Sequence, residues 1–241
     1  MAVLPSLLLF ALLLASARAD TCGSQQYDPS QYVCYYNQFL CPFVNGEGLS
    51  YCNGACYSQY MYQCTDNNTL ALLPAVNCPF TMTISNPQAP SINGLVVNAC
   101  GGGFSAGELS ETCTYCPTQV APYCPSGNET VLYSSGSMAS EVPGGQQWYV
   151  DPSGALAFTA PHSAFIPSGS QIGGFAAYQN GGLVNLGSPF GFYACPHVSQ
   201  SVVVYWDIFQ QIAGVTVSSS CVGVNILVHP VEDAEYAWEY T

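Results

Sequence analysis

From Cys78 onward, short apolar runs alternate with clusters of glycine, proline, serine and asparagine. Such runs, punctuated by turn residues, are typical of the short strands of a sandwich or a barrel. The pattern predicts strands over Thr81–Ser85, Gly94–Asn98, Thr130–Tyr133, Gln147–Val150, Ala155–Thr159, Val202–Asp207 and Val222–Val228. Because no convincing 3.6-residue helical period interrupts them, we expect residues 75–241 to form an all-β, sandwich-like or barrel-like domain.

Cysteines dominate the preceding segment. Six of the 13 cysteines lie between residues 22 and 64, namely Cys22, Cys34, Cys41, Cys52, Cys56 and Cys64. So small a segment buries too little apolar surface to fold alone, whereas each disulfide contributes roughly 2–4 kcal/mol. We therefore expect a small disulfide-rich module over residues 20–74 and a mostly β protein. Six cysteines permit 15 pairings, among which the spacing does not choose.

The same segment repeats itself. A shift of 30 residues aligns Cys22 with Cys52, Tyr27 with Tyr57, Tyr32 with Tyr62, Cys34 with Cys64, Asn37 with Asn67, and Leu40 with Leu70. The alignment predicts two copies of one small unit. Cys41 and Cys56 fall outside the repeat, and we hypothesise that they pair with each other.

The N-terminus has the pattern of a signal peptide. Residues Leu4 to Ala15 are almost wholly apolar, and Ala17-Arg18-Ala19 supplies a small-x-small cleavage site. The apolar run is too short for a stable membrane anchor, so we expect residues 1–19 to be removed and the protein to be secreted, outside the cell or in its wall. In that compartment the cysteines are expected to form disulfides. The sequons at Asn67 and Asn128 predict N-glycosylation.

Charge excludes several partners. The chain holds 14 acidic residues and a single basic one, Arg18, for a formal net charge of −13. Nucleic acids and anionic membranes attract clustered cations, so neither is expected to bind. Cleavage of the signal peptide removes Arg18 as well, which leaves packing, hydrogen bonds and disulfides to stabilise the mature protein.

Aromatic residues crowd the cysteine-rich segment. A small module can bury few rings, and exposed tyrosines offer sugars an apolar face and a hydroxyl group. We expect carbohydrate to bind at Tyr27, Tyr32, Tyr35, Tyr36, Phe39, Tyr57, Tyr60 and Tyr62. In the alternative interpretation, two or three tyrosines form a miniature core and others cover a domain contact.

This segment resembles a fungal carbohydrate-binding module, the family 52 type attached to endo-1,3-β-glucanases. The resemblance rests on Tyr27-Asp-Pro-Ser-Gln-Tyr-Val-Cys34, Phe39-Leu-Cys-Pro42, Asn45-Gly46 and Cys52-x-x-x-Cys56-Tyr57. It covers roughly residues 22 to 70 and implies binding to the β-1,3-glucan of a cell wall. The second repeat departs from the family pattern, since Tyr57-Ser-Gln-Tyr60 replaces a second Tyr-Asp-Pro-Ser.

The rest of the chain resembles fungal cell-wall proteins of the phialide-development type, a group that includes mould allergens. The motifs are Tyr123-Cys-Pro-Ser-Gly-Asn-Glu-Thr130, the stretch 142–156, Pro161-His-Ser-Ala-Phe-Ile-Pro-Ser-Gly169, Gly191-Phe-Tyr-Ala-Cys-Pro196 and Ala237-Trp-Glu-Tyr240. The resemblance implies a wall-associated protein without a recognised catalytic activity. It also implies that the family's disulfide cysteines are Cys116, Cys124, Cys195 and Cys221. Cys78, Cys100 and Cys113 are additional, which predicts a free thiol or a bridge to the module.

Several patterns suggest chemistry, and each has a simpler explanation. Gly103-Phe-Ser-Ala-Gly107 matches a nucleophile elbow but lacks the helix that should follow Ser105. Sequence order alone builds no catalytic triad, so we expect the three histidines, His162, His197 and His229, to form local hydrogen bonds. Cys113-Thr-Tyr-Cys116 lacks the second half of a zinc site. The acidic residues Glu232, Asp233, Glu235 and Glu239 are expected to form a solvated face rather than a calcium site. We expect Trp148, Trp206 and Trp238 to anchor the core.

These features predict a non-catalytic cell-wall protein that binds β-1,3-glucan through the tyrosines of its N-terminal module, without metal or cofactor. Two alternatives stay open. One is a glycoside hydrolase of unrecognised type that the module directs to β-glucan. The other is a secreted effector or allergen that binds a protein partner.

Overall fold

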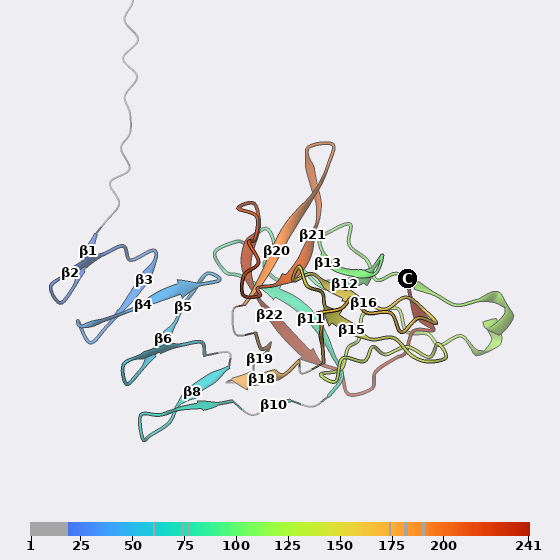
Figure 1. Cartoon of the computed structure of the whole chain (residues 1–241), viewed down its shortest axis with the longest axis horizontal. Helices are drawn as coiled ribbons and strands as arrows, with labels where there is room; N and C mark the ends of the chain where they lie inside the picture. Colours follow the sequence, from blue (N-terminus) through green and yellow to red (C-terminus); the bar gives the residue numbers. More distant parts are fainter. Residues whose placement is uncertain are drawn as a thin grey trace, which may run out of the picture.

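The computed structural model describes residues 19–241 apart from residues 60, 74, 77, 174, 181, 182, 189 and 190. The predicted signal peptide lies outside the described residues, except for Ala19. The one helix in the described part of the chain is a short 3-10 helix, η1 (Thr118–Tyr123), so the predicted mostly β fold is confirmed. Figure 1 shows a stack of small hairpins beside a larger β-structure. We call these the module (β1–β9) and the β domain (β10–β23).

The module is a series of short antiparallel hairpins. β1 pairs with β2, β3 with β4, β4 with β5, β6 with β7, and β8 with β9. The strands are β1 (Asp20–Cys22), β2 (Gln25–Tyr27), β3 (Tyr32–Tyr35), β4 (Phe39–Val44), β5 (Glu47–Gly48), β6 (Ser50–Cys52), β7 (Ala55–Tyr57), β8 (Tyr62–Cys64) and β9 (Leu70–Leu72).

The structure repeats as the sequence does. Strands β1, β2 and β3 recur 30 residues later as β6, β7 and β8. The disulfides Cys22–Cys34 and Cys52–Cys64 occupy equivalent positions, each with a Cα–Cα distance of 5.7 Å. A long-range backbone bond is duplicated too, since Phe43 N donates to Gln31 O in the first copy and Leu73 N donates to Met61 O in the second. The predicted duplication is therefore confirmed.

Disulfides take the place of a hydrophobic core in the module. The third bridge joins Cys41 to Cys56, the two cysteines outside the repeat. Cys22, Cys41 and Cys52 are buried, whereas the described aromatic rings of the module are all half-buried or exposed. None of the described aromatic rings of the module is fully buried, and the miniature tyrosine core of the alternative interpretation stays a prediction.

The β domain is built on one branched, antiparallel sheet in the order β10-β18-β19-β22-β20-β21-β13-β16-β15-β17, with β11 added to β22 and β12 to β13. Its strands are β10 (Ala75–Val76), β11 (Phe80–Ser85), β12 (Val97–Cys100), β13 (Gly103–Ala106), β15 (Trp148–Val150), β16 (Leu156–Phe158), β17 (Gln171–Ile172), β18 (Ala177–Asn180), β19 (Leu183–Leu186), β20 (Phe192–Ser199), β21 (Val202–Gln210) and β22 (Val222–Pro230). Near the C-terminus, β14 (Thr114–Tyr115) pairs separately with β23 (Glu239–Tyr240).

Alternate residues of this sheet face a single core. Phe80, Met82 and Ile84 of β11 are buried while their neighbours are half-exposed, and β22 shows the same alternation. Trp148 of β15 is fully buried in this core and stacks on Phe175 at a ring-centroid distance of 3.6 Å. The prediction that Trp148 anchors the core is confirmed, and the side chain of Trp206 packs against the same core.

Several strand predictions needed correction. The strand expected over Gly94–Asn98 begins at Val97, and the one expected over Thr130–Tyr133 is reduced to isolated bridges at Leu132. Strands β13 and β17 to β20 were not predicted. Most of these lie in segments rich in glycine, serine or asparagine, where local composition favours turns and tertiary pairing overrides it.

Three disulfides lie in the β domain. Cys100 pairs with Cys113, Cys116 with Cys124, and Cys195 with Cys221. Cys78 keeps a free, half-buried thiol, which is one of the two outcomes that the odd number of cysteines predicted. The two cysteines of the Cys113-Thr-Tyr-Cys116 motif thus belong to different disulfides and form no metal knuckle.

Candidate functional site

Four aromatic rings gather on the module around Tyr51. Tyr35 stacks on Tyr51 at a centroid distance of 5.9 Å, Tyr36 meets it edge-on at 5.6 Å, and Phe39 lies against it at 4.8 Å. The Tyr35 hydroxyl donates a hydrogen bond to Leu49 O at 3.2 Å. Tyr36, in contrast, is 80% exposed. We call these four rings the Tyr51 cluster; Tyr36 is its exposed member, and the other three rings are half-buried.

The eight aromatic residues predicted to bind carbohydrate do not share one exposed surface. Tyr32 and Tyr36 are exposed, whereas the others in the described part of the chain are half-buried, namely Tyr27, Tyr35, Phe39, Tyr57 and Tyr62. Tyr60 lies outside the described residues. The expectation that most of these rings are exposed is therefore corrected: five of the seven described ones are half-buried. Tyr51 was not among the predicted residues, although its place among aromatic neighbours in the sequence was a signal.

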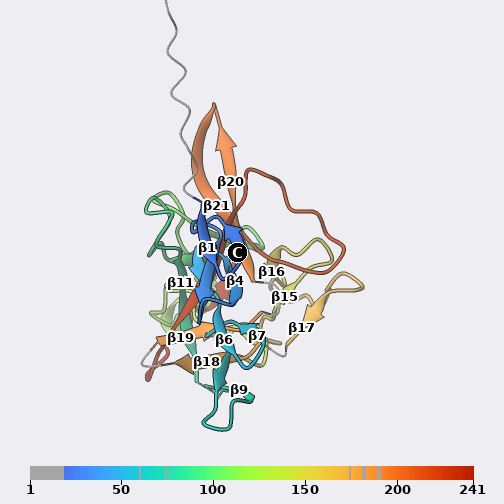
Figure 2. The same cartoon turned by 90° about the vertical axis from the view of Figure 1, so that its left-hand side faces the viewer.

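The module is held to the β domain by the turn between β4 and β5. Asn45 and Gly46 form this two-residue turn with φ angles of 52° and 81°, the conformation that an Asn-Gly hairpin favours. Asn45 Nδ2 donates to Val224 O at 3.0 Å, across 179 positions of the sequence. The amide fits against Gly191 and Gly223, where a Cβ atom would collide with it. Figure 2, seen from the module's side, shows the small hairpins lying over the β domain.

The contribution of this turn can be measured with a matched pair of variants. Asn45→Ala is expected to lower the free energy of unfolding by about 2 kcal/mol, because it removes a partly buried hydrogen bond and places alanine at positive φ. Asn53 occupies the same kind of turn between β6 and β7, with φ of 44°, and Gly54 beside it has open space. Asn53→Ala should therefore cost only about 1 kcal/mol. The measurement is urea unfolding. If Asn45→Ala and Asn53→Ala lost the same free energy of unfolding, the contact of Asn45 with the β domain would contribute nothing.

Below this turn a cleft of about 500 Å³ opens between the two parts of the molecule. The module supplies most of its lining, and β19, β20, β22 and the loop after β19 supply the other wall. The lining residues are Val44, Asn45, Glu47, Gly48, Leu49, Cys56, Tyr57, Ser58, Gln59, Met61, Tyr62 and Leu70 from the module, and Leu186, Ser188, Gly191, Phe192 and Asn225 from the β domain. Two of the predicted carbohydrate-binding residues, Tyr57 and Tyr62, thus face this cleft.

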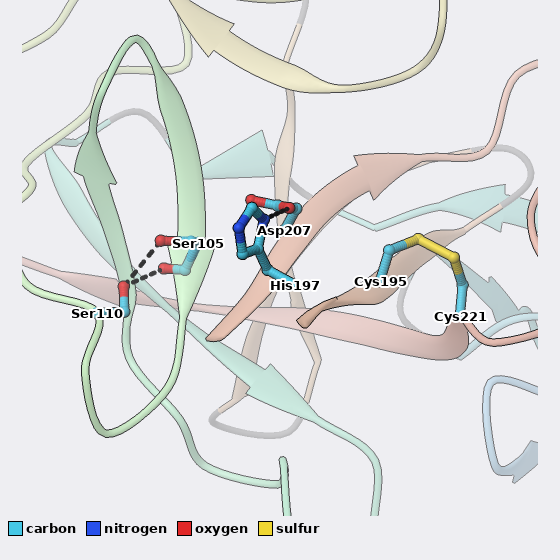
Figure 3. A network of polar contacts seen from close by, with 6 residues as sticks. All are labelled: Ser105, Ser110, Cys195, His197, Asp207 and Cys221. Carbon is cyan, nitrogen blue, oxygen red and sulfur yellow. Dashed lines mark hydrogen bonds and ion pairs between the residues drawn. A yellow bond between two sulfur atoms is a disulfide. The ribbon is translucent and has the colours of Figure 1, made fainter. Parts of the chain in front are cut away.

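A second group of polar residues lies on β13, β20 and β21, as Figure 3 shows. His197 Nδ1 lies 3.5 Å from Asp207 Oδ2, and its ring stacks on Tyr205. Partial burial raises the pKa of Asp207, and the nearby His197 opposes that rise. Ser105 lies within strand β13, whereas a nucleophile elbow needs a strand-to-helix turn. Its hydroxyl is hydrogen-bonded to the Ser110 hydroxyl at 2.9 Å, so it has a local partner.

The other candidate groups also have local roles. His229 Nε2 is hydrogen-bonded to Thr83 Oγ1 at 2.8 Å, across the β11–β22 pair. The expected solvated face of C-terminal acidic residues is corrected at Glu239, which is buried in β23 beside β14. Within the described residues, no three His, Cys, Asp or Glu side chains are placed to share a metal ion.

Comparison with known families agrees with this two-part architecture. A carbohydrate-binding family model matches residues 21–70, the span of the hairpin repeat. A second model, for PhiA-like secreted proteins, matches residues 80–241, which is more than half of the chain. The chain belongs to the PhiA-like secreted protein family. The β domain is therefore a PhiA-like domain, and the protein is extracellular.

Two relatives cover parts of the chain. An uncharacterized secreted protein of Arthroderma benhamiae is 47% identical over 95 residues, 39% of this chain and 48% of that protein. The primary septum glucan endo-1,3-beta-D-glucosidase of Schizosaccharomyces pombe is 43% identical over 53 residues, 22% of this chain and 5% of the enzyme. The chain thus spans less than half the length of either relative. No solved structure matches this PhiA-like protein.

The surface of the PhiA-like protein leaves both predicted glycosylation sites accessible. Both sequon residues, Asn67 and Asn128, are exposed, so an oligosaccharide can be attached to either without displacing the core. In the described part of the chain, no helix is long and apolar enough to span a bilayer.

Proposed function

We propose that this protein is a non-catalytic component of the cell wall that binds β-1,3-glucan through the tyrosines of its N-terminal module. In this proposal residues 20–74 act as the binding module, and residues 75–241 act as a structural, wall-associated domain. The observation that carries the proposal is the Tyr51 cluster: four aromatic rings in mutual contact, one of them exposed, within the segment that the carbohydrate-binding model matches.

The chemistry of the cluster suits a neutral polysaccharide. Sugar rings present flat patches of C–H groups, which pack on aromatic faces, and hydroxyl groups, which bond to phenols at the rim. By analogy with other aromatic contacts, each ring contributes about 1 kcal/mol. Several rings that engage one polysaccharide strand add through multivalency. The net charge of −13 disfavours anionic polymers but leaves an uncharged glucan unaffected.

Two observations support β-1,3-glucan as the polysaccharide and binding as the activity. The 53-residue similarity to a glucan endo-1,3-beta-D-glucosidase covers only 5% of that enzyme, a length close to that of the module. In the PhiA-like domain, the serine of the G-x-S-x-G motif lies in mid-strand and is bonded to Ser110. Binding therefore accounts for the site with fewer assumptions than hydrolysis does.

The proposal is tested with the full chain, produced in an oxidising host and incubated with insoluble β-1,3-glucan, chitin and cellulose. Wild-type protein is expected to be retained on β-1,3-glucan alone. Tyr36→Ala should weaken that binding about fivefold, because it removes one stacking ring at about 1 kcal/mol. Tyr123→Ala is the matched control, since Tyr123 is equally exposed, at 80%, but lies on η1 of the other domain.

The outcomes separate the parts of the proposal. Retention on none of the three polysaccharides would overturn it and favour a protein partner. Retention on chitin or cellulose alone would show that the glycan is wrongly assigned. Equal binding by the Tyr36 and Tyr123 variants would remove the Tyr51 cluster from the site.

A further inference from the structure

We propose that the cleft between the module and the PhiA-like domain is a second glucan subsite, in which the PhiA-like domain itself contacts the polysaccharide. This inference rests on the proposed function and extends it: the second domain becomes part of the binding site. The occupant is a segment of a neutral β-1,3-glucan chain.

The internal repeat places the same pair of tyrosines in two different surroundings. Tyr27 and Tyr32 of the first copy correspond to Tyr57 and Tyr62 of the second, on equivalent strands. Tyr32 is 39% exposed, whereas Tyr57 and Tyr62 line the cleft that the PhiA-like domain covers. Tyr32 and its repeat equivalent Tyr62 therefore differ in their surroundings: Tyr32 is exposed, whereas Tyr62 is half-buried and lines the cleft.

The lining suits a neutral, hydroxyl-rich ligand. Met61, Leu186 and Phe192 contribute apolar residues to the lining, while Tyr57, Tyr62 and Glu47 contribute residues that carry polar groups. A carboxylate accepts hydrogen bonds from sugar hydroxyls but repels an anionic ligand. The volume of about 500 Å³ lies within the usual range for small-ligand sites.

Asn225 adds an observation from the PhiA-like side. Its Nδ2 atom is buried and has no hydrogen-bond partner within the described residues, although the residue lines the cleft. Its Oδ1 atom accepts a long bond, of 3.5 Å, from Asn45. An unpaired buried donor is unfavourable, and a small rotation of this side chain lets a sugar hydroxyl in the cleft accept its hydrogen bond.

Enclosure makes the covered subsite the stronger of the two tyrosine pairs. A ring that stacks on an open surface leaves one side of the sugar in water, whereas a cleft with two walls removes more of that water and holds its polar groups in place. The Asn45–Gly46 turn fixes the distance between the two walls, so little conformational freedom is lost when the ligand enters.

The test uses the repeat as its own control. Binding of a soluble β-1,3-linked glucan oligosaccharide to the full chain is measured by calorimetry. Tyr62→Ala is expected to weaken binding about tenfold, and its equivalent in the first copy, Tyr32→Ala, about threefold or less. From the opposite wall, Ser188→Trp should fill the cleft and match the Tyr62 variant, whereas Ser219→Trp on an exposed loop should bind like the wild type.

The outcomes distinguish this inference from the proposed function. If the wild type binds and both Tyr62→Ala and Ser188→Trp bind as tightly as the wild type, the cleft is not a subsite, while the proposed function stands. If Tyr32→Ala loses more affinity than Tyr62→Ala, the open surface is the stronger site and the inference is overturned. Should Tyr62→Ala fail to fold, Ser188→Trp decides alone. If the wild type bound no β-1,3-glucan at all, the proposed function itself would be overturned.

Discussion

Trp148→Ala is expected to lower the free energy of unfolding of the PhiA-like domain by about 3–5 kcal/mol. Trp148 is fully buried, stacks on Phe175, and meets Phe80 and Phe104 edge-on. Its indole Nε1 also donates to Tyr133 O at 3.0 Å, so the substitution removes this hydrogen bond as well, although the same carbonyl still accepts one from Gly136 N. This loss is a large fraction of the stability of a typical domain, about 5–15 kcal/mol.

The measurement is urea unfolding followed by circular dichroism, with Trp206→Ala as the control. Both variants remove the same side chain, but Trp206 is only partly buried at the edge of the core. Trp206→Ala should lower the free energy of unfolding clearly less than Trp148→Ala does, because fewer neighbouring atoms are left around an empty space. Equal losses from the two variants would show that Trp148 is not the centre of the core.

Removing the Cys41–Cys56 disulfide by replacing both residues with alanine is expected to destabilise the module by about 2–4 kcal/mol and to abolish retention on glucan. The bridge joins the two repeats, since Cys41 lies in β4 and Cys56 in β7. Without it, the first and second copies lose the link that positions the Tyr51 cluster beside the covered tyrosines. Replacing both cysteines avoids a reactive unpaired thiol.

The control removes a disulfide from the other domain. Cys116 and Cys124 close a short loop around η1, none of whose residues is buried. Changing both to alanine should reduce stability through the same effect on the unfolded chain, yet leave glucan retention intact. If the Cys41–Cys56 variant kept full retention, the order of the module would not be required for binding. If both variants lost it equally, the effect would be one of general stability.

Local patterns in the sequence predicted much of the architecture. The 30-residue offset between Cys22 and Cys52 predicted the duplicated hairpins, because equal spacing of cysteines and tyrosines builds equal hairpins. Alternating residues predicted β11 and β22 within a residue or two at their ends. Strand β20 escaped prediction because Pro196 interrupts its pattern, and its pairing with β21 and β22 decides its conformation.

The candidate site was predictable only in part. The residue types were visible in the sequence, since tyrosines and cysteines crowd one short segment. Their division into an open cluster and a covered pair was not visible, because it depends on which rings the second domain overlies. The role of Tyr51 at the centre of the cluster likewise follows from the packing of three rings from β3, β4 and the turn between them.

By itself, the sequence determined the mostly β class, the duplicated disulfide-rich module, the division into two parts and the acidic character of this protein. These are properties of spacing and composition, and short-range geometry is enough to express them. Only the tertiary structure decided where the module sits, that Glu239 is buried, and that Asn45 meets Val224 across 179 positions to frame a cleft. Those contacts join distant segments through side-chain fit, and no local pattern of the chain encodes which surfaces fit.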